Sequence, residues 1–211
     1  MLARAHPGTI QAAVGIHPHY AAGLPAGAWD ELAELAAAPG VAAVGEIGLD
    51  FFRNLSPPDA QRVAFGRQLT LAASLGKPVL VHDRDAHDEI RAALLDHGHL
   101  AGGKQVRGVL HAFSGDAAMA SDLAAAGYLI SFALPVAFRS AAGPRAAARA
   151  LPAGSFLVET DAPWLAPGGA GQRNEPTTAL RVAAELARLR GVAPPMIAMD
   201  VRLAYDRLIG P

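Results

Sequence analysis

Six short apolar segments recur along the chain, separated by longer stretches with a different periodicity. Segments of this length, rich in β-branched residues, are typical of buried β-strands. They cover residues 9–16, 41–48, 78–82, 108–111, 128–132 and 156–159. We therefore predict six strands.

Apolar residues spaced three and four positions apart fill much of the intervening sequence and predict amphipathic helices. These stripes run through residues 29–36, 65–73, 90–94, 182–189 and 197–208. Gly76 followed by Pro78 is typical of a helix end and a strand start. The first residues look like the tail of a helix, and no strand is predicted after the last two helices.

Repeated strand-then-helix units imply parallel strands with helices outside, as in a doubly wound open sheet or a (β/α) barrel. The chain has no Gly-x-Gly-x-x-Gly after the first strand and no phosphate-binding Gly-Lys-Ser/Thr. Nucleotide-binding open sheets are therefore not supported. The longest stretch without a pattern, residues 162–176, is rich in Gly and Pro and is a candidate substrate-covering loop.

Composition and charge narrow the function classes. The 211 residues fit one large domain or two small ones, at about 150 residues per domain. Lys plus Arg (18) nearly balances Asp plus Glu (19), so binding DNA through a broadly basic surface is not expected. The absence of Cys excludes disulfides, thiolate metal sites and cysteine nucleophiles. Any metal must be held by His, Asp and Glu.

The chain carries no sign of membrane insertion or export. Its longest uncharged apolar run, residues 123–138, contains Gly127 and Pro135 and is too short to span a bilayer. No apolar stretch of signal-peptide length follows the first charges. We expect a cytoplasmic protein without a membrane partner.

Four metal-capable side chains fall at or just past the ends of predicted strands: Glu46, His82, His111 and Asp161. A single histidine at a strand end is more often a hydrogen-bonded structural residue than a metal ligand. In a parallel barrel, however, the carboxyl ends of the strands surround one mouth, where the active site lies. Two imidazoles and two carboxylates suit Zn, Mn, Fe or Mg better than Ca. The pattern therefore favours a metal centre.

Other polar residues near the strand ends are candidates for substrate contact. His17 ends the first strand and points into the mouth or simply opens a loop. Arg84 and Arg173 are suited to bidentate phosphate contacts or to surface salt bridges. Glu159, two residues before Asp161, is a partner for the metal ligands or an interior barrel residue. His97-Gly98-His99 follows no strand, and we interpret it as the solvated end of a helix.

Together the motifs resemble those of the TatD family of metal-dependent deoxyribonucleases. The matching segments, in the family's order, are residues 15–19 (GIHPH), 45–51 (GEIGLDF), 81–84 (VHDR), 111–115 (HAFSG), 159–163 (ETDAP) and 173–176 (RNEP). Each is weak alone, but the set covers nearly the whole chain.

The resemblance implies a (β/α)8 barrel that hydrolyses DNA phosphodiesters from the 3′ end with two divalent ions, Mg, Mn or Zn. By similarity, Glu46 bridges the metals and His82 and His111 complete the second-metal site. Asp161 binds the first metal and helps to deprotonate the attacking water. Paired cations stabilise both the attacking and the leaving oxygen. DNA is then held as a substrate without a stable basic surface.

One departure from the family is large. The family opens with a strand ending in His-x-His, which supplies two ligands of the first metal, and nothing before Thr9 matches it. We therefore expect residues 1–211 to form a single TIM (β/α)8-type barrel domain that lacks the first two β/α units. Either the protein begins upstream of residue 1, or this chain is a truncated product. Without the His-x-His ligands, we expect one bound metal instead of two.

Two alternatives remain open at this point. The chain is either a catalytically impaired or non-catalytic fragment that binds at most one metal, or a barrel hydrolase of small esters or amides with the same ligands. The choice of metal, the preference for DNA or RNA and the oligomeric state are likewise open.

Overall fold

The computed structural model describes residues 2–100, 107–169 and 171–209. The chain forms two compact units, residues 1–109 and 110–211. No helix among the described residues is long and apolar enough to cross a membrane.

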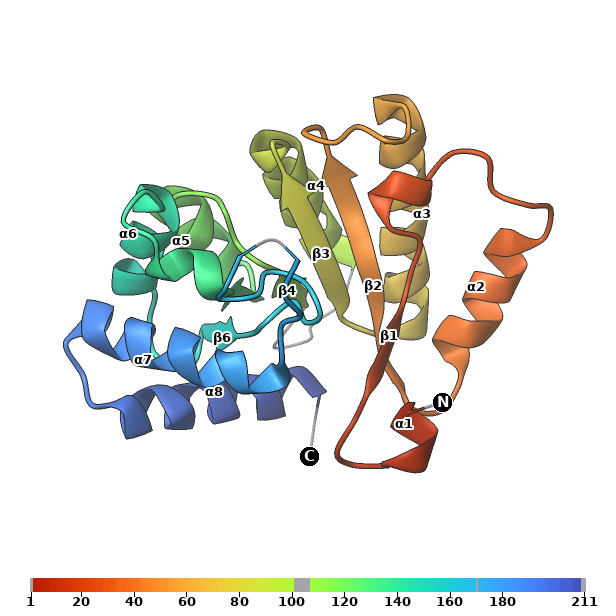
Figure 1. The fold of residues 1–211 in the computed structure, drawn as a ribbon. Coiled ribbons are helices and arrows are strands. Elements are labelled where there is room, and N and C mark those ends of the chain that lie inside the picture. The colour runs from red at the N-terminus through yellow and green to blue at the C-terminus, as the bar shows by residue number, and fades with distance from the viewer. Residues whose placement is uncertain (1, 101–106, 170, 210–211) are drawn as a thin grey trace. The chain divides into compact units, whose positions relative to one another are not determined.

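All six predicted strands are present, in one sheet whose strand order follows the sequence (Figure 1). They are β1 (Ala12–Val14), β2 (Val41–Asp50), β3 (Val79–Arg84), β4 (Gly108–Leu110), β5 (Tyr128–Phe132) and β6 (Phe156–Val158). The pairs β1–β2, β2–β3 and β5–β6 are parallel. The prediction of an α/β fold with six strands is therefore confirmed.

The first unit alternates strands and helices along the chain. After the short helix α1 (Leu2–Ala5) and the 3-10 turn η1 (Pro18–Tyr20) come α2 (Ala28–Ala37), α3 (Pro58–Leu75) and α4 (His87–Leu100). The core of this unit includes Val44, Ile47, Val81, Ile90 and Leu94, each at most 1% exposed. These residues come from both strands and helices, as the apolar periodicity predicts.

The second unit has four α-helices within its described residues. They are α5 (Ala117–Ala125), α6 (Ala142–Ala150), α7 (Ala179–Arg190) and α8 (Pro194–Ile209), with 3-10 turns η2 (Leu134–Ala137) and η3 (Pro176–Thr178). Gly191 ends α7 in the left-handed conformation and α8 begins at Pro194, as predicted. The helices α5 and α6, each nine residues long and rich in alanine, were not predicted. The carboxylate of Asp116, which accepts a hydrogen bond from the backbone N–H of Met119, was a usable start signal for α5.

The interpretation of His97 as solvated is wrong. This residue lies near the end of α4 as expected, but only 2% of it is exposed. It follows Ile90 and Leu94 at helical spacing, so it shares their buried face. Burial lowers its pKa, which keeps the ring neutral. The side chain of His99 lies outside the described part.

Candidate metal centre

Glu46 occupies an irregularity in the pairing of β2 with β3. Gly45 pairs with Leu80 and Ile47 with Val81, so Glu46 is an extra residue on β2. A bulge of this kind redirects a side chain and is common beside active sites. Both strands continue past their predicted ends, so Glu46 lies within a strand and not at its end.

A glycine allows β2 to approach the backbone that carries His82. Gly48 has φ 140°, and a Cβ placed there would lie 2.0 Å from the carbonyl oxygen of His82. Any larger residue would force the strands apart. Gly48 thereby sets the separation between the two strands that present Glu46 and His82.

The first unit brings His17, Glu46 and His82 together. Each offers a ligand atom, and the three atoms lie within 4.8 Å of one another. Oε1 of Glu46 is 2.9 Å from Nδ1 of His82 and 3.7 Å from Nε2 of His17. Two imidazoles and a carboxylate fit a divalent ion such as Zn or Mn. This group therefore meets the spacing and the chemistry of a metal site.

Asp50, for which no role was predicted, lies directly behind this group. Its side chain is 1% exposed, and its Oδ2 is 2.8 Å from Nε2 of His19 and 3.1 Å from Nε2 of His82. The backbone N–H of Arg53 donates to its Oδ1 at 2.7 Å. Burial favours a higher pKa for Asp50, but these hydrogen bonds outweigh it and hold the pKa below its usual value. Asp50 is thus a buried, ionised carboxylate.

Proton counting at His82 shows why a cation fits beside it. The two ring nitrogens face two different carboxylates, Glu46 at Nδ1 and Asp50 at Nε2. A neutral imidazole has a single N–H and can donate to only one of them. If the Nε2 proton of His82 is donated to Asp50, the Nδ1 lone pair faces Glu46. A divalent ion can then be bound by Nδ1 of His82 and the carboxylate of Glu46. A carboxylate behind a metal-binding histidine is a common arrangement.

His17 has a different hydrogen-bonding pattern. Burial, opposed by Glu46 and assisted by His82, lowers the pKa of His17 to about 4, so its ring is neutral at pH 7. Its Nδ1 accepts a hydrogen bond from the backbone N–H of His19 at 3.2 Å. The ring proton is then on Nε2, the nitrogen that faces Glu46. In this form His17 is a hydrogen-bond donor toward the site and not a metal ligand, which leaves Glu46 and His82 as the candidate ligands of the first unit.

The second unit contains a similar carboxylate and histidine arrangement. Nδ1 of His111 lies 2.7 Å from Oε1 of Glu159, and its Nε2 lies 3.7 Å from Oδ1 of Asp161. The same Glu159 oxygen accepts from the backbone N–H of Ala112. With its Nδ1 proton donated to Glu159, His111 presents the Nε2 lone pair toward Asp161. The structure thus pairs Glu46 with His82 in one unit and His111 with Asp161 in the other.

The two candidate phosphate-binding arginines are exposed. Arg84, at the end of β3, places its guanidinium carbon 4.1 Å from the ring centre of Phe52. Within the described part of the chain it forms no ion pair, so its fork of donors faces solvent. Arg173 lines a pocket in the second unit. Both are therefore accessible to an anionic substrate.

Asn174, the residue after Arg173, anchors the loop that follows Asp161. It is 2% exposed, and its amide donates to the carbonyl oxygens of Thr160 (2.7 Å) and Leu165 (3.3 Å). Its backbone N–H donates to the carbonyl oxygen of Pro163 at 2.9 Å. Asn174 belongs to the RNEP motif, but no role was predicted for it. Its partners are up to 14 residues away, beyond the range of local patterns.

Known proteins are similar in sequence to this chain over most of its length. The model of the TatD related DNase family matches residues 1–210. YabD of Bacillus subtilis, described as an uncharacterized metal-dependent hydrolase, is 35% identical over 182 residues, which cover 86% of this chain and 70% of YabD. The 3′-5′ ssDNA/RNA exonuclease TatD of Erwinia tasmaniensis is 35% identical over 213 residues, covering 98% of this chain and 81% of that protein.

A solved structure shares the fold as well. The crystal structure of YJJV, a TatD homologue from Escherichia coli, superposes with a TM-score of 0.85 at 32% sequence identity. The match covers 95% of this chain and 77% of that one. On the family match, the sequence identities and this shared fold, the chain belongs to the TatD related DNases, a family of metal-dependent hydrolases.

Proposed function

We propose that this chain removes nucleotides from the 3′ end of DNA by metal-dependent hydrolysis of phosphodiester bonds. The observation that carries the proposal is the repeated arrangement of a histidine between two carboxylates, Asp50-His82-Glu46 in one unit and Glu159-His111-Asp161 in the other. The Erwinia relative is named as an exonuclease of single-stranded DNA and RNA. The sequence resemblance points to the same reaction.

The proposed metal ligands are Glu46 and His82 in the first unit, and His111 and Asp161 in the second. Asp50 and Glu159 orient the two imidazoles and increase their basicity. A bound divalent ion supplies Lewis acidity and lowers the pKa of a coordinated water. We propose that a complete set of ligands binds two divalent ions, which are Mg, Mn or Zn. A chain without the His-x-His ligands would bind one.

The chain's own groups then perform the proton transfer and hold the substrate. Asp161 is partly exposed, so its carboxylate is accessible to a water molecule and suited to accept its proton. Glu46 is also proposed as a catalytic residue, because its negative charge beside His82 helps to hold the metal that activates the water. The Nε2–H of His17 donates to a phosphate oxygen, and the guanidinium groups of Arg84 and Arg173 bind phosphate through paired hydrogen bonds.

Cleavage of a 3′-labelled single-stranded oligonucleotide tests the proposal. The chain is assayed with Mn or Mg, with a chelator, and as Glu46→Gln, with Glu34→Gln on the exposed face of α2 as the matched control. We expect release of the label by the chain and the control, none with chelator, and a loss of at least about 100-fold in Glu46→Gln. Undiminished activity in Glu46→Gln would show that the measured cleavage does not depend on this site, and would overturn the proposal.

The two alternatives give different results in the same preparation. The ligand set suits both reactions, so the substrates must distinguish them. A small-ester or amide hydrolase would cleave a panel of such substrates and leave the oligonucleotide intact. A non-catalytic fragment would be folded by circular dichroism yet cleave neither substrate. Its metal content, measured by mass spectrometry after dialysis against Mn or Zn, would be at most one ion per chain.

A further inference from the structure

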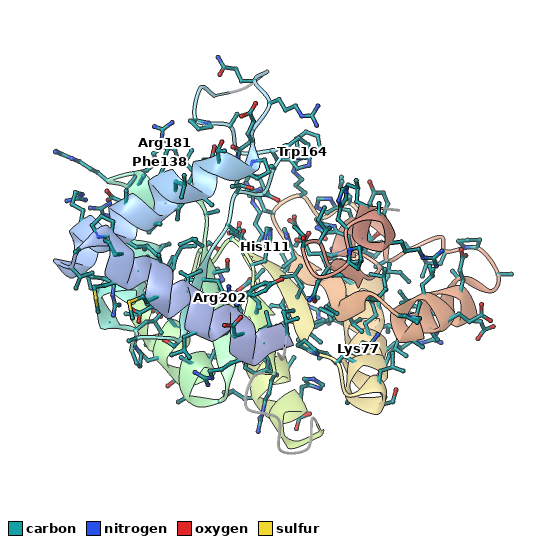
Figure 2. All side chains as sticks on the ribbon, turned by 90° about the horizontal axis from the view of Figure 1, so that it is seen from below. Lys77, His111, Phe138, Trp164, Arg181 and Arg202 are labelled. Carbon is teal, nitrogen blue, oxygen red and sulfur yellow. The ribbon has the colours of Figure 1, made fainter. Side chains whose placement is uncertain are left out.

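Two large aromatic side chains are exposed on the second unit and line one pocket. Trp164 is 71% exposed and Phe138 is 56% exposed, and both are labelled in Figure 2. The pocket has a volume of about 580 Å³ and is also lined by Leu134, Pro135, Leu165 and Arg173. Ligand sites commonly have roughly 300–1,000 Å³. Leaving both rings in water does not help folding, so we attribute the arrangement to binding.

The pocket is tied to the segment that carries Asp161. The backbone N–H of Trp164 donates to the carbonyl oxygen of Asp161 at 2.7 Å, which closes a tight turn between them. Asn174 holds the far side of the loop through its bonds to Thr160, Pro163 and Leu165. Trp164 is thus fixed three residues beyond the proposed proton acceptor, so a group bound in this pocket belongs to the substrate being cleaved.

The chemistry of the lining identifies that group. Flat aromatic faces bind nucleobases by stacking, and a guanidinium adds a phosphate contact or a stacking contact. The net charge of −1 gives no general attraction to a polyanion, so local contacts must hold the strand. An apolar peptide would use the two rings but leave Arg173 without an anion. A nucleobase with its phosphate uses all three.

We infer that Phe138, Trp164 and Arg173 form a stacking subsite for one base of a single-stranded nucleic acid. Bases in a duplex have their faces covered by neighbouring pairs, so only an unpaired base can enter the pocket. The inference rests on the proposed function, because the bound strand is the substrate of the same site. It adds three residues that bind the base, none of which is a proposed metal ligand.

Fluorescence tests the subsite without catalysis. The chain has two tryptophans, and Trp29→Phe removes the other one, which lies in the first unit with Arg67 stacked over its ring. In chelator, a single-stranded oligonucleotide should quench Trp164 fluorescence, whereas an abasic strand of equal length and charge should not. Equal quenching by both strands would mean that the phosphates alone are bound, and would overturn the inference.

Kinetics with matched variants complete the test. Trp164→Leu keeps an apolar side chain but loses the aromatic face, Trp164→Tyr restores a ring, and Tyr205→Ala removes an exposed aromatic outside the pocket. We expect about a tenfold rise in KM for Trp164→Leu with kcat unchanged, most of the affinity back in Trp164→Tyr, and no change in Tyr205→Ala. An unchanged KM in Trp164→Leu, or preferential binding of an apolar peptide, would contradict the inference.

The two proposals fail in different ways. Base-dependent quenching without any cleavage would leave the subsite standing and remove the proposed reaction. Metal-dependent cleavage that abasic and normal strands undergo equally well would leave the reaction standing and remove the subsite.

Discussion

Nε2 of His82 lies 3.1 Å from Oδ2 of Asp50, a carboxylate that is almost fully buried. The same imidazole has its other nitrogen 2.9 Å from Glu46. The buried carboxylate therefore fixes which nitrogen of His82 carries the proton and which one is free to bind a metal.

Removing the charge of Asp50 should weaken metal binding while leaving the proposed ligands in place. Asp50→Asn keeps the size of the side chain, but its amide no longer favours a proton on Nε2 of His82. We expect a loss of about 10–100-fold in Mn affinity, measured by calorimetric titration. Asp30→Asn, on the exposed surface of α2, is the control. Equal affinities in the two variants would show that Asp50 does not act through His82.

In the second unit, Glu159 is expected to orient His111 as Asp50 orients His82. Glu159→Ala removes the acceptor of the His111 Nδ1 proton and frees the ring to turn away from Asp161. We expect kcat for oligonucleotide cleavage to fall about 10–100-fold. Glu159→Gln, whose side-chain oxygen can still accept from His111, should retain more of the activity than Glu159→Ala. The reverse order would exclude an orienting role.

Substitution of His17 separates substrate binding from metal binding. Because its Nδ1 accepts from the His19 backbone, we expect Nε2 to donate to the substrate. His17→Ala should therefore raise KM about tenfold, the cost of roughly one charge-assisted hydrogen bond, without changing the metal content. His17→Gln, which also offers an N–H donor, should recover part of the loss. A loss of bound metal in His17→Ala would make His17 a ligand instead.

An ion-pair network between α6 and α7 predicts how stability depends on pH. Oε1 of Glu185 is 2.8 Å from Arg145 and 2.6 Å from Arg188, and these hydrogen bonds, Arg188 first, outweigh burial and lower the pKa of Glu185 to about 2. A depressed carboxylate pKa stabilises the fold fully above the ordinary value of 4.5, and the contribution is lost as the pH falls toward 2.

Glu185→Gln should therefore lower the free energy of unfolding at pH 7 by about 2 kcal/mol, after allowing for the solvent exposure of Arg188. The difference from the parent chain should shrink between pH 4.5 and 2, as the parent carboxylate becomes protonated. Urea unfolding at several pH values measures both quantities. A difference that stays constant down to pH 2 would show that the charge of Glu185 is not the cause.

Local periodicity was sufficient for the strands and for the helices with strong apolar stripes. Strand and helix repeats are properties of consecutive residues, so the six strands and the long helices could be read from the sequence. The helix α5 could not, because its alanines contribute little to an apolar stripe, and the short helix α6 was also missed. His97 was predicted to be exposed because polar residues at helix ends usually are. It is buried because it lies on the same face of α4 as Ile90 and Leu94.

The sequence by itself determined the α/β class and the residue types of the site, because parallel strands present their chemistry near their carboxyl ends. It did not reveal Asp50 behind His82, the tautomer of His17 or the anchoring bonds of Asn174. It also did not bring Phe138 to the same pocket as Trp164. These relationships join atoms of residues from different parts of the fold, and only tertiary packing sets the distances and directions between them.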